Sequence, residues 1–326
     1  MTENKLVWPT YLTIDSIQQR KNFDQLNDIE AANLKEGITN SSSPWSVSDG
    51  RIKAPKRRNR YSNVFPFNHN RVKLPCTKKN DYINASRVQI DEESKYIVTQ
   101  GPIESTIHHF WAMCFNESEL NNTDTIVIVM LTSLVEDGIF KCIQYWPNDI
   151  NEVNSDASSI EDKIDIGSLR VKFLKKSYNK EGDFSLTELE LKSATKVKKV
   201  YHYYYYKWAD ARTPPSSESL QILSSHIHEH DNETTGKIIP IVHCSAGVGR
   251  SGTFIALDYF FKNPQLFKSE NIDPNQFGPY NPSDDLILNT VSTLRHYRMM
   301  MVQTIHQYIF LYDTVIKLYK QINSTS

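Results

Sequence analysis

Residues 243–252, His243-Cys-Ser-Ala-Gly-Val-Gly-Arg-Ser-Gly252, decide the fold of this chain. Mostly β-branched residues precede them at 238–242 and predict a buried strand. Apolar residues at helical spacing follow at 254–261 and predict a helix. The residues between Cys244 and Arg250 are enough for a tight loop whose backbone N–H groups point toward one anion. The stretch therefore predicts a phosphate-binding loop between a strand and a helix, with a sulfur at its floor.

The same surroundings are expected to activate Cys244. A helix N-terminus and a nearby cation lower the pKa of a thiol from about 8.5 to roughly 3.5–7.5, so we expect a thiolate at cellular pH. Arg250 can grip two phosphate oxygens with its planar fork. His243 would orient the loop and help tune the thiol, and Ser251 would hydrogen-bond the sulfur as it departs from a phosphoenzyme. A structural cysteine beside a glycine-rich turn is the alternative, and this spacing disfavours it.

The composition of the 326 residues suits one large or two small globular α/β domains. A formal net charge of −1 argues against bulk nucleic-acid binding. The four cysteines show neither zinc spacing nor a disulfide framework, which favours a reducing compartment. No apolar run is long enough to span a bilayer. We therefore expect a cytosolic protein without a membrane anchor, with the nucleus also open to it. The oligomeric state stays open.

Further motifs accompany the loop in a fixed order along the chain. They are Asn59–Val64 (NRYSNV), Asp81–Ser86 (DYINAS), Tyr96–Pro102 (YIVTQGP), Glu136–Pro147 (EDGIFKCIQYWP), Trp208–Asp210 (WAD) and Gln303–Gln307 (QTIHQ). Together with the loop, they make the chain resemble the protein tyrosine phosphatases, the phosphotyrosine-specific family with a Cys-x5-Arg loop. The resemblance covers about 59–320 and points to the intracellular, non-receptor type, including its small fungal members.

This resemblance implies an α/β fold in which a highly twisted, mixed central β-sheet is flanked by helices. It implies hydrolysis of phosphotyrosine in proteins through a cysteinyl-phosphate, with phosphotyrosine-containing proteins as the partners. Neither a metal nor a cofactor is expected, because thiolate, arginine and amide dipoles supply the electrostatics. We expect a catalytic domain at residues 51–323, preceded at residues 1–50 by an N-terminal helical segment and a linker.

The resemblance also assigns roles to single residues. Asp210 is the general acid that protonates the phenolic oxygen, and Gln303 positions the water that hydrolyses the intermediate. Tyr61 stacks on the substrate ring and makes the cleft too deep for phosphoserine. The residues expected to bind substrate are Tyr61, Asn63, Ser245, Ala246, Gly247, Val248, Gly249, Arg250, Asp210 and Gln303. The supporting residues are His243, Glu136, which pairs with Arg250, Lys141, which lies near the general-acid loop, Trp208 and Gln307.

Three positions depart from the family pattern. Ala209 replaces a proline that would limit the conformations of the general-acid loop, so a slower acid step is expected. Asn63 replaces an aspartate, which predicts weaker anchoring of the peptide backbone. His306 replaces an aspartate between two glutamines that are both retained.

These departures leave two alternatives open. One is a phosphotyrosine-binding module with weak or no turnover, and the other is a dual-specificity or lipid phosphatase with the same Cys-x5-Arg loop. Tyr61 and Gln303 favour a deep tyrosine site, and turnover by the purified protein would separate a binding module from an enzyme.

Three charged regions have less specific interpretations. The basic run 51–60 predicts a solvated lead-in, with a nuclear-localisation signal as the alternative. The acidic stretch 148–167 predicts a mobile surface loop. Either Arg295 or Arg298 is expected to support the phosphate loop, with binding of a second acidic group as the alternative. In the N-terminal segment, a loose helical pattern over 11–34 is expected to break at Gly37.

Overall fold

A computed structural model describes residues 6–53, 57–76, 80–149, 153–155, 166–232, 234 and 236–324. The longer helices are α1 (Ser16–Thr39), α2 (Ile107–Leu120), α3 (Ser217–Ile227), α4 (Gly249–Lys262), α5 (Leu286–Tyr297) and α6 (Ile305–Ser324). The shorter helical turns are η1 (Thr10–Leu12), η2 (Asp49–Lys53), η3 (Glu104–Thr106), η5 (Pro264–Phe267), η6 (Ser269–Asn271), η7 (Pro274–Phe277) and η8 (Pro282–Asp284).

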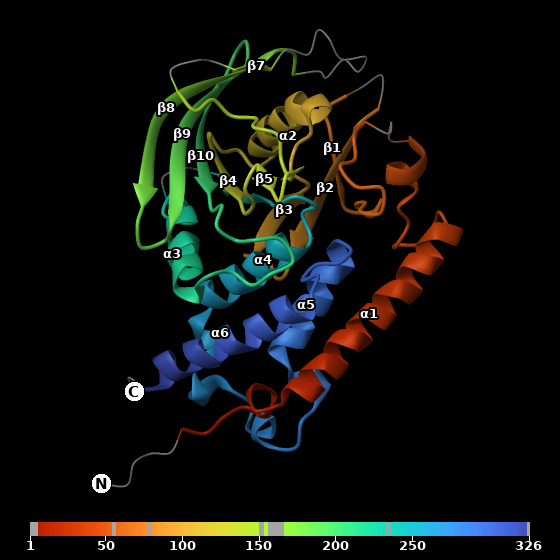
Figure 1. Cartoon of the computed structure of the whole chain (residues 1–326), viewed down its shortest axis with the longest axis vertical. Coiled ribbons are helices and arrows are strands. Elements are labelled where there is room, and N and C mark those ends of the chain that lie inside the picture. The colour runs from red at the N-terminus through yellow and green to blue at the C-terminus, as the bar shows by residue number, and fades with distance from the viewer. Residues whose placement is uncertain are drawn as a thin grey trace.

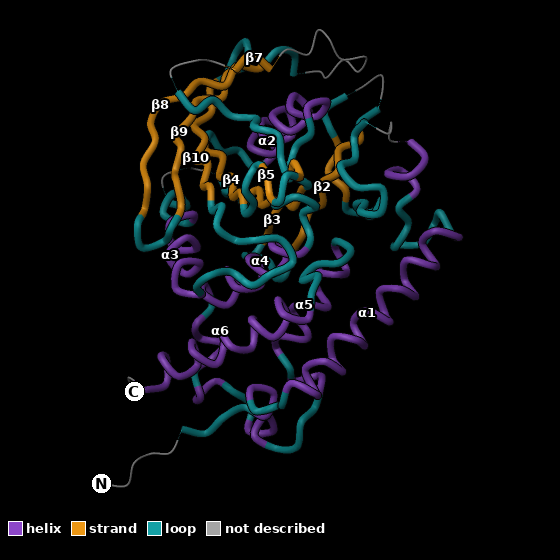
Figure 2. The backbone as a smooth tube through the Cα atoms, viewed as in Figure 1, coloured by secondary structure: helices purple, strands orange, loops and turns teal. Residues whose placement is uncertain are grey.

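Nine strands form one sheet, and two further strands form a small hairpin. The strands of the sheet are β1 (Arg71–Lys73), β2 (Tyr82–Gln89), β3 (Lys95–Thr99), β4 (Thr125–Met130), β7 (Val153–Ser155), β8 (Leu169–Asn179), β9 (Phe184–Lys192), β10 (Val197–Tyr204) and β11 (Ile241–His243). The hairpin strands are β5 (Val135–Glu136) and β6 (Ile139–Phe140). The sheet has the order β1-β2-β3-β11-β4-β10-β9-β8-β7, and Figure 2 shows its strands as a curved orange layer. Its central strands β3, β11, β4 and β10 run parallel, while the outer pairs are antiparallel.

Helices cover both faces of this sheet (Figure 1). α2 lies on one face, and α3 to α6 lie on the other, where α4 is buried against the central strands. Alternate residues of β4 belong to the two cores: Val127 and Val129 face α4, and Ile126 and Ile128 face α2. This double burial explains the continuous apolar run at β4. The mixed sheet flanked by helices confirms the predicted fold class.

The N-terminal helix α1 packs against α5 and α6. Its residues Phe23 and Leu26 are buried in the same core as α4 and α6. The helix does not end at Gly37, as the sequence predicted, but continues to Thr39. A Cβ at Gly37 would lie 2.0 Å from the carbonyl oxygen of Trp45, so this glycine permits a close approach of the chain rather than a break. The division of the chain at residue 50 stays a prediction.

Most predicted elements are present with shifted ends. The strand and the helix predicted on either side of the phosphate loop are β11 and α4, and β8 and β9 form an antiparallel pair. Most of the predicted acidic loop 148–167 lies outside the described residues, and its described part includes the short strand β7. No helix within the described ranges is both long and apolar enough to cross a membrane.

A buried carboxylate ties α4 to the rest of the core. Asp258 is fully buried and accepts hydrogen bonds from Tyr96 at 2.6 Å and Ser224 at 2.7 Å. His228 Nε2 lies 3.1 Å from Asp258 Oδ2, and its Nδ1 lies 3.0 Å from Asp231. Burial alone would lower the pKa of His228, but these two carboxylates raise it to about 9. The imidazolium therefore persists at neutral pH and compensates the buried charge of Asp258.

This pair predicts an alkaline loss of stability. Because the folded pKa of His228 lies above its unfolded value of 6.5, its contribution is complete below pH 6.5 and disappears as the pH rises through about 9. At roughly 1.4 kcal/mol per pKa unit, the contribution is on the order of 3 kcal/mol. We expect the free energy of unfolding, measured in urea at pH 6 and pH 10, to fall less steeply with pH for His228→Gln than for wild type. His306→Gln, at an exposed histidine, is the control. Equal slopes for wild type and His228→Gln would contradict the pair.

Candidate active site

The phosphate-binding loop lies where the sequence predicts it. β11 ends at His243, Cys244 follows, and α4 begins at Gly249. Gly247 has a φ of +71°, and a Cβ there would lie 2.2 Å from the carbonyl oxygen of Thr99. Both constraints favour glycine at this position. The Gly247 N–H donates to the Cys244 sulfur at 3.3 Å, so the loop is wrapped around the thiol.

One pocket contains most of the residues predicted to bind substrate. It is lined by Tyr61, Asn63, Val64, Asp210, Cys244, Ser245, Ala246, Val248, Gly249, Arg250, Met300 and Gln303. Gly247 and Ser251 lie at the loop without lining the pocket, and the predicted supporting residues lie around it. Val64 and Met300 were not predicted to line the pocket: Val64 belongs to the Asn59–Val64 motif, but both side chains are apolar and look like ordinary core residues.

Arg298 supports the loop from its outer side. Its fully buried side chain donates to the carbonyl oxygens of Gly247 at 2.7 Å and Ala246 at 3.0 Å. It also donates to Asn84 at 2.8 Å and Ser86 at 3.1 Å, both on β2. These bonds hold the loop carbonyls away from the pocket. Of the two arginines that the sequence offered for this support, Arg298 is the one that contacts the loop.

The pKa of the Cys244 thiol is lowered although the residue is buried. Burial by itself would raise this pKa. The Arg250 charge, the Ser251 side chain and backbone, and the Val248 backbone together outweigh burial. The Ser251 hydroxyl is buried and makes no well-formed hydrogen bond within the described part of the chain. It therefore has a hydrogen bond free for the sulfur, and its role in the departure of the sulfur stays a prediction.

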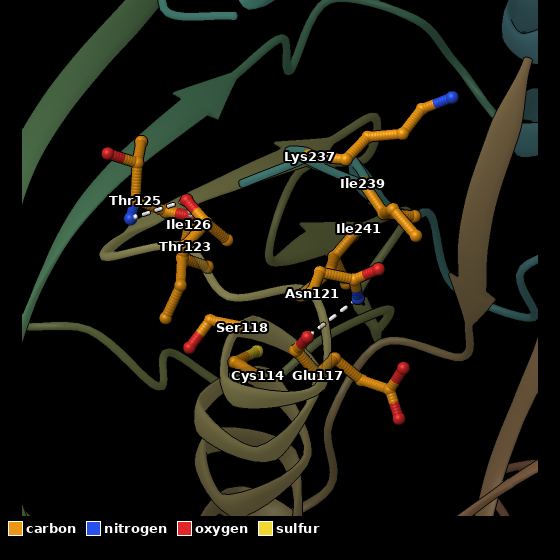
Figure 3. A pocket seen from close by; sticks show the side chains of 10 residues that line it. All are labelled: Cys114, Glu117, Ser118, Asn121, Thr123, Thr125, Ile126, Lys237, Ile239 and Ile241. Carbon is orange, nitrogen blue, oxygen red and sulfur yellow. Dashed lines mark hydrogen bonds between the residues drawn. The ribbon is translucent and has the colours of Figure 1, made fainter. Parts of the chain in front are cut away.

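Two other buried cysteines show how the phosphate-binding loop changes the pKa of a thiol. Burial raises the pKa of Cys142 to about 12 and also raises that of Cys114. Cys114 borders a small hollow at the end of α2, with Glu117, Asn121 and Lys237 (Figure 3). In this hollow, Asn121 donates to the Glu117 carbonyl oxygen, and no guanidinium lines it. At Cys142 burial outweighs the charge of Arg60, and no guanidinium lines the hollow beside Cys114, so both thiols stay protonated, unlike Cys244.

Arg250 is the centre of the charge network. Its Nη1 donates to Glu136 at 2.5 Å and to the Trp208 carbonyl oxygen at 2.7 Å, and its Nη2 lies 3.2 Å from Asp210. The side chain is buried, yet its Nε has no hydrogen-bond partner among the described residues. A buried, unpaired donor is costly unless a ligand completes it. The Nε–H is therefore a natural donor to an anion above Cys244.

Asp210 lies inside the pocket, about half exposed. Its carboxylate contacts Lys141 at 2.8 Å and Arg250 at 3.2 Å, and its backbone N–H donates to Glu136 at 3.0 Å. Burial would raise the pKa of Asp210, but Lys141 and Arg250 lower it overall. Asp210 with these partners is therefore ionised at neutral pH. Glu136 joins Asp210 to Arg250, because its other carboxylate oxygen accepts a hydrogen bond from Arg250.

His243 is a neutral, hydrogen-bonded ring beside Cys244. It is fully buried, and burial lowers its pKa to about 4, so the ring is neutral at pH 7. Its Nδ1 donates to the Cys244 carbonyl oxygen at 3.1 Å, since that oxygen can only accept. Its Nε2 then accepts from Tyr145 at 2.7 Å, and Tyr145 also contacts His202 at 2.8 Å. These bonds fix the backbone at the nucleophile.

Tyr61 forms one wall of the pocket. Its hydroxyl lies 2.8 Å from Ser245 Oγ, which in turn donates to the Lys141 carbonyl oxygen at 2.8 Å. The aromatic ring is thereby fixed beside the loop. Asn63 lines the same pocket and is exposed at its rim. On the opposite side, Gln307 Oε1 accepts from the backbone N–H of Gln303 at 3.0 Å and holds that residue in place.

The prediction of a solvated basic run was wrong for two residues. Arg58 is buried and donates to the carbonyl oxygens of Asn80 and Tyr82. Arg60 donates to the carbonyl oxygens of Gly101, Pro102 and Phe140, and so joins the β5–β6 hairpin to the chain after β3. Charge density alone does not reveal which arginines find buried carbonyl groups. Part of the run, residues 54–56, lies outside the described residues.

Comparison with known proteins agrees with this geometry. Residues 55–317 match the family described as protein-tyrosine phosphatase. Tyrosine-protein phosphatase 1 of Saccharomyces cerevisiae is 36% identical over 325 residues, which cover 93% of this chain and 94% of that protein. The chain belongs to the protein-tyrosine phosphatase family, and as a member it hydrolyses phosphotyrosine in proteins.

Other relatives are longer than this chain. Tyrosine-protein phosphatase 1 of Schizosaccharomyces pombe is 34% identical, and the match covers 91% of this chain but 50% of that protein. Tyrosine-protein phosphatase non-receptor type 2 of Mus musculus is 33% identical, with 86% of this chain and 62% of that protein covered.

A solved structure of PTPN18 superimposes with a TM-score of 0.72 at 25% identity, covering 92% of this chain and 94% of that chain.

The contact between Lys141 and Asp210 predicts a change in the pH dependence of catalysis. The alkaline limb of kcat reports the pKa of the acid in the enzyme–substrate complex, which we expect to be Asp210. Lys141→Met removes a cation that lowers this pKa, so the limb should move to higher pH. The measurement is a kcat profile on an aryl phosphate, with Lys268→Met, at an exposed lysine, as the control. An unmoved alkaline limb in Lys141→Met would show that Lys141 does not set the pKa of the acid.

Proposed function

We propose that this phosphatase works in two steps, with Cys244 as nucleophile and Asp210 as the acid and then the base. In the first step the thiolate attacks phosphorus, the bond from phosphorus to the tyrosine oxygen breaks, and Asp210 gives that oxygen its proton. In the second step a water oxygen attacks phosphorus, the S–P bond breaks, and Asp210 accepts the proton of the water. Cys244 leaves as the thiolate, and inorganic phosphate is released.

The observation that carries this proposal is the unpaired donor of Arg250 above a thiol of lowered pKa. Its buried Nε–H lacks a partner among the described residues, and the Gly247 N–H already points at the sulfur. A phosphate held by these groups would have its phosphorus next to Cys244. Because these donors are already held in place, they need not rearrange to stabilise the charge that develops on the equatorial oxygens of the phosphate.

Arrival of the phosphate would also prepare the acid. The substrate needs Arg250, so it competes with Asp210 for the Nη2 group that now lies 3.2 Å from the carboxylate. Asp210 then loses a cation and gains the negative phosphate as a neighbour, and both changes raise its pKa. The carboxyl group thus takes up a proton when the leaving oxygen needs one. Ala209, which leaves the loop less restricted than proline would, makes this movement easier and the closed loop less populated.

Selectivity for tyrosine follows from the depth of the pocket. The Tyr61 ring stands beside the loop, and Cys244 lies buried at the floor. A phenyl group reaches that floor while stacking on Tyr61, whereas the short side chain of phosphoserine does not. We propose that Asn63 binds the peptide backbone at the rim and that Gln303 positions the water of the second step.

We further propose that the protein acts on phosphotyrosine signalling proteins in the cytoplasm, with the nucleus also open to it. No disulfide joins the cysteines of the described residues, which suits a reducing compartment. The relative from mouse is named tyrosine-protein phosphatase non-receptor type 2. No metal is required in this scheme, and within the described residues no cluster of His, Cys, Asp and Glu could hold one.

The direct test is phosphate release from a phosphotyrosine peptide and from the same peptide with phosphoserine, both in EDTA. We expect release from the tyrosine peptide alone. Cys244→Ser should abolish it, because an alcohol at this site stays protonated. Asp210→Asn should slow it about 100-fold, in the range for loss of a general acid. Binding of the tyrosine peptide without release by wild type would support the binding-module alternative, and equal release from both peptides would support dual specificity.

A further inference from the structure

The turn before Gln303 holds two residues in an unfavourable backbone conformation. Met300 has a φ of 59° and Val302 a φ of 58°, both in the left-handed region. This region is uncommon for any residue with a side chain and most unusual for a β-branched one. Such conformations persist where surrounding groups hold them, and they concentrate at functional sites. Met300 and Gln303 both line the catalytic pocket.

Glu30 and Arg295, which we call the turn clamp, hold this strained turn. Arg295 donates from Nε to the Met301 carbonyl oxygen at 3.1 Å and from Nη2 to the Val302 carbonyl oxygen at 3.1 Å. Glu30 Oε1 accepts from the Met300 N–H at 2.5 Å. The turn clamp therefore binds three successive residues of the turn.

The two members of the turn clamp depend on each other. Glu30 Oε2 lies 3.5 Å from Arg295 Nη1, and both side chains are almost completely buried. Asn27, one turn earlier on α1, also accepts from Arg295 at 2.9 Å. Burial raises the pKa of Glu30, while Arg295 and the Met300 N–H oppose that rise. Removing the carboxylate would leave both a buried guanidinium and a backbone N–H with fewer partners.

Glu30 links the N-terminal helix to the turn beside the catalytic pocket. Glu30 lies on α1, outside the residues 55–317 that match the phosphatase family. The turn lies against the phosphate loop, since the Val302 N–H donates to the Val248 carbonyl oxygen at 3.3 Å. The N-terminal helix thus reaches the catalytic pocket through Glu30.

We propose that Glu30 is a positioning residue for the second step: it holds the turn so that Gln303 directs water at the cysteinyl-phosphate. The inference rests on the water-positioning role of Gln303 proposed above. In this step the water oxygen bonds to phosphorus, its proton passes to Asp210, and the S–P electron pair returns to Cys244. Without the turn clamp, Gln303 moves with the relaxed turn and the water attacks less often.

Formation of the phosphoenzyme does not depend on the turn clamp as its hydrolysis does. Its groups are Cys244, Arg250 and Asp210, which are held by Glu136, Trp208 and Lys141 from the strand ends on the other side of the pocket. Loss of Glu30 should therefore slow the breakdown of the phosphoenzyme and spare its formation. A role in overall folding alone would slow both steps together.

The experiment compares substitutions that keep or remove the acceptor at Glu30. Glu30→Gln keeps an oxygen for the Met300 N–H, whereas Glu30→Met keeps the volume and removes the oxygen. Arg295→Lys tests the clamp from its other member, because lysine keeps the charge but not the two-pronged fork. Asp28→Asn, at an exposed position of the same helix, is the control. All proteins are full-length, and their folding is checked by thermal unfolding.

Rapid quenching with p-nitrophenyl phosphate gives the rate of the initial phenol burst and the fraction of enzyme present as cysteinyl-phosphate. We expect Glu30→Met and Arg295→Lys to keep the burst rate within about twofold, to accumulate phosphoenzyme, and to lose about tenfold in kcat with a parallel fall in KM. Glu30→Gln should stay close to wild type.

The inference is overturned if burst rate and kcat fall together, or if phosphoenzyme does not accumulate in a folded Glu30→Met or Arg295→Lys protein. Either variant decides the question if the other does not fold. A wild-type protein that never forms cysteinyl-phosphate would instead contradict the proposed two-step function itself.

Discussion

The buried guanidinium of Arg250 is the group on which the rest of the site depends. A thiolate at Cys244 would be unfavourable in this buried position without a neighbouring cation. The cation is itself buried, and a buried charge needs partners. Burial lowers the pKa of Arg250, but Cys244, Glu136 and Asp210 raise it above its ordinary value. Arg250 therefore helps to keep Cys244 and Asp210 ionised, and Cys244, Glu136 and Asp210 in turn stabilise its own charge.

This charge network explains why the site draws on distant parts of the chain. The parallel strands β3, β4, β10 and β11 end at the same edge of the sheet, and the segments that follow them meet there. β11 leads to Cys244, β4 leads to the hairpin with Glu136, and β10 leads to the loop with Asp210. Ligand sites of open α/β sheets occur at this carboxyl edge. The segment after β3 carries Gly101, whose carbonyl oxygen accepts a hydrogen bond from Arg60.

How much the sequence could predict depended on whether a residue carries a chemical signature. The nucleophile loop was predictable, because a cysteine and an arginine at this spacing between a strand and a helix have few other uses. The pairing of Glu136 with Arg250 was predictable only through the family resemblance. The turn clamp was not predictable, since the strain at Val302 is a property of the backbone and Glu30 resembles any other glutamate on a helix. The burial of Arg58 was missed for the same reason: its partners are carbonyl groups, which every residue has.

Ionisation of Cys244 is the central claim, and its direct measurement is the pH dependence of alkylation. Iodoacetamide reacts with the thiolate, so the rate of inactivation reports its fraction, and mass spectrometry identifies the modified residue. Cys244→Ser supplies the background from the other cysteines. The account predicts a midpoint clearly below the ordinary thiol value of about 8.5. A midpoint at or above that value would show that Arg250 and the loop do not hold a thiolate, and would contradict the account.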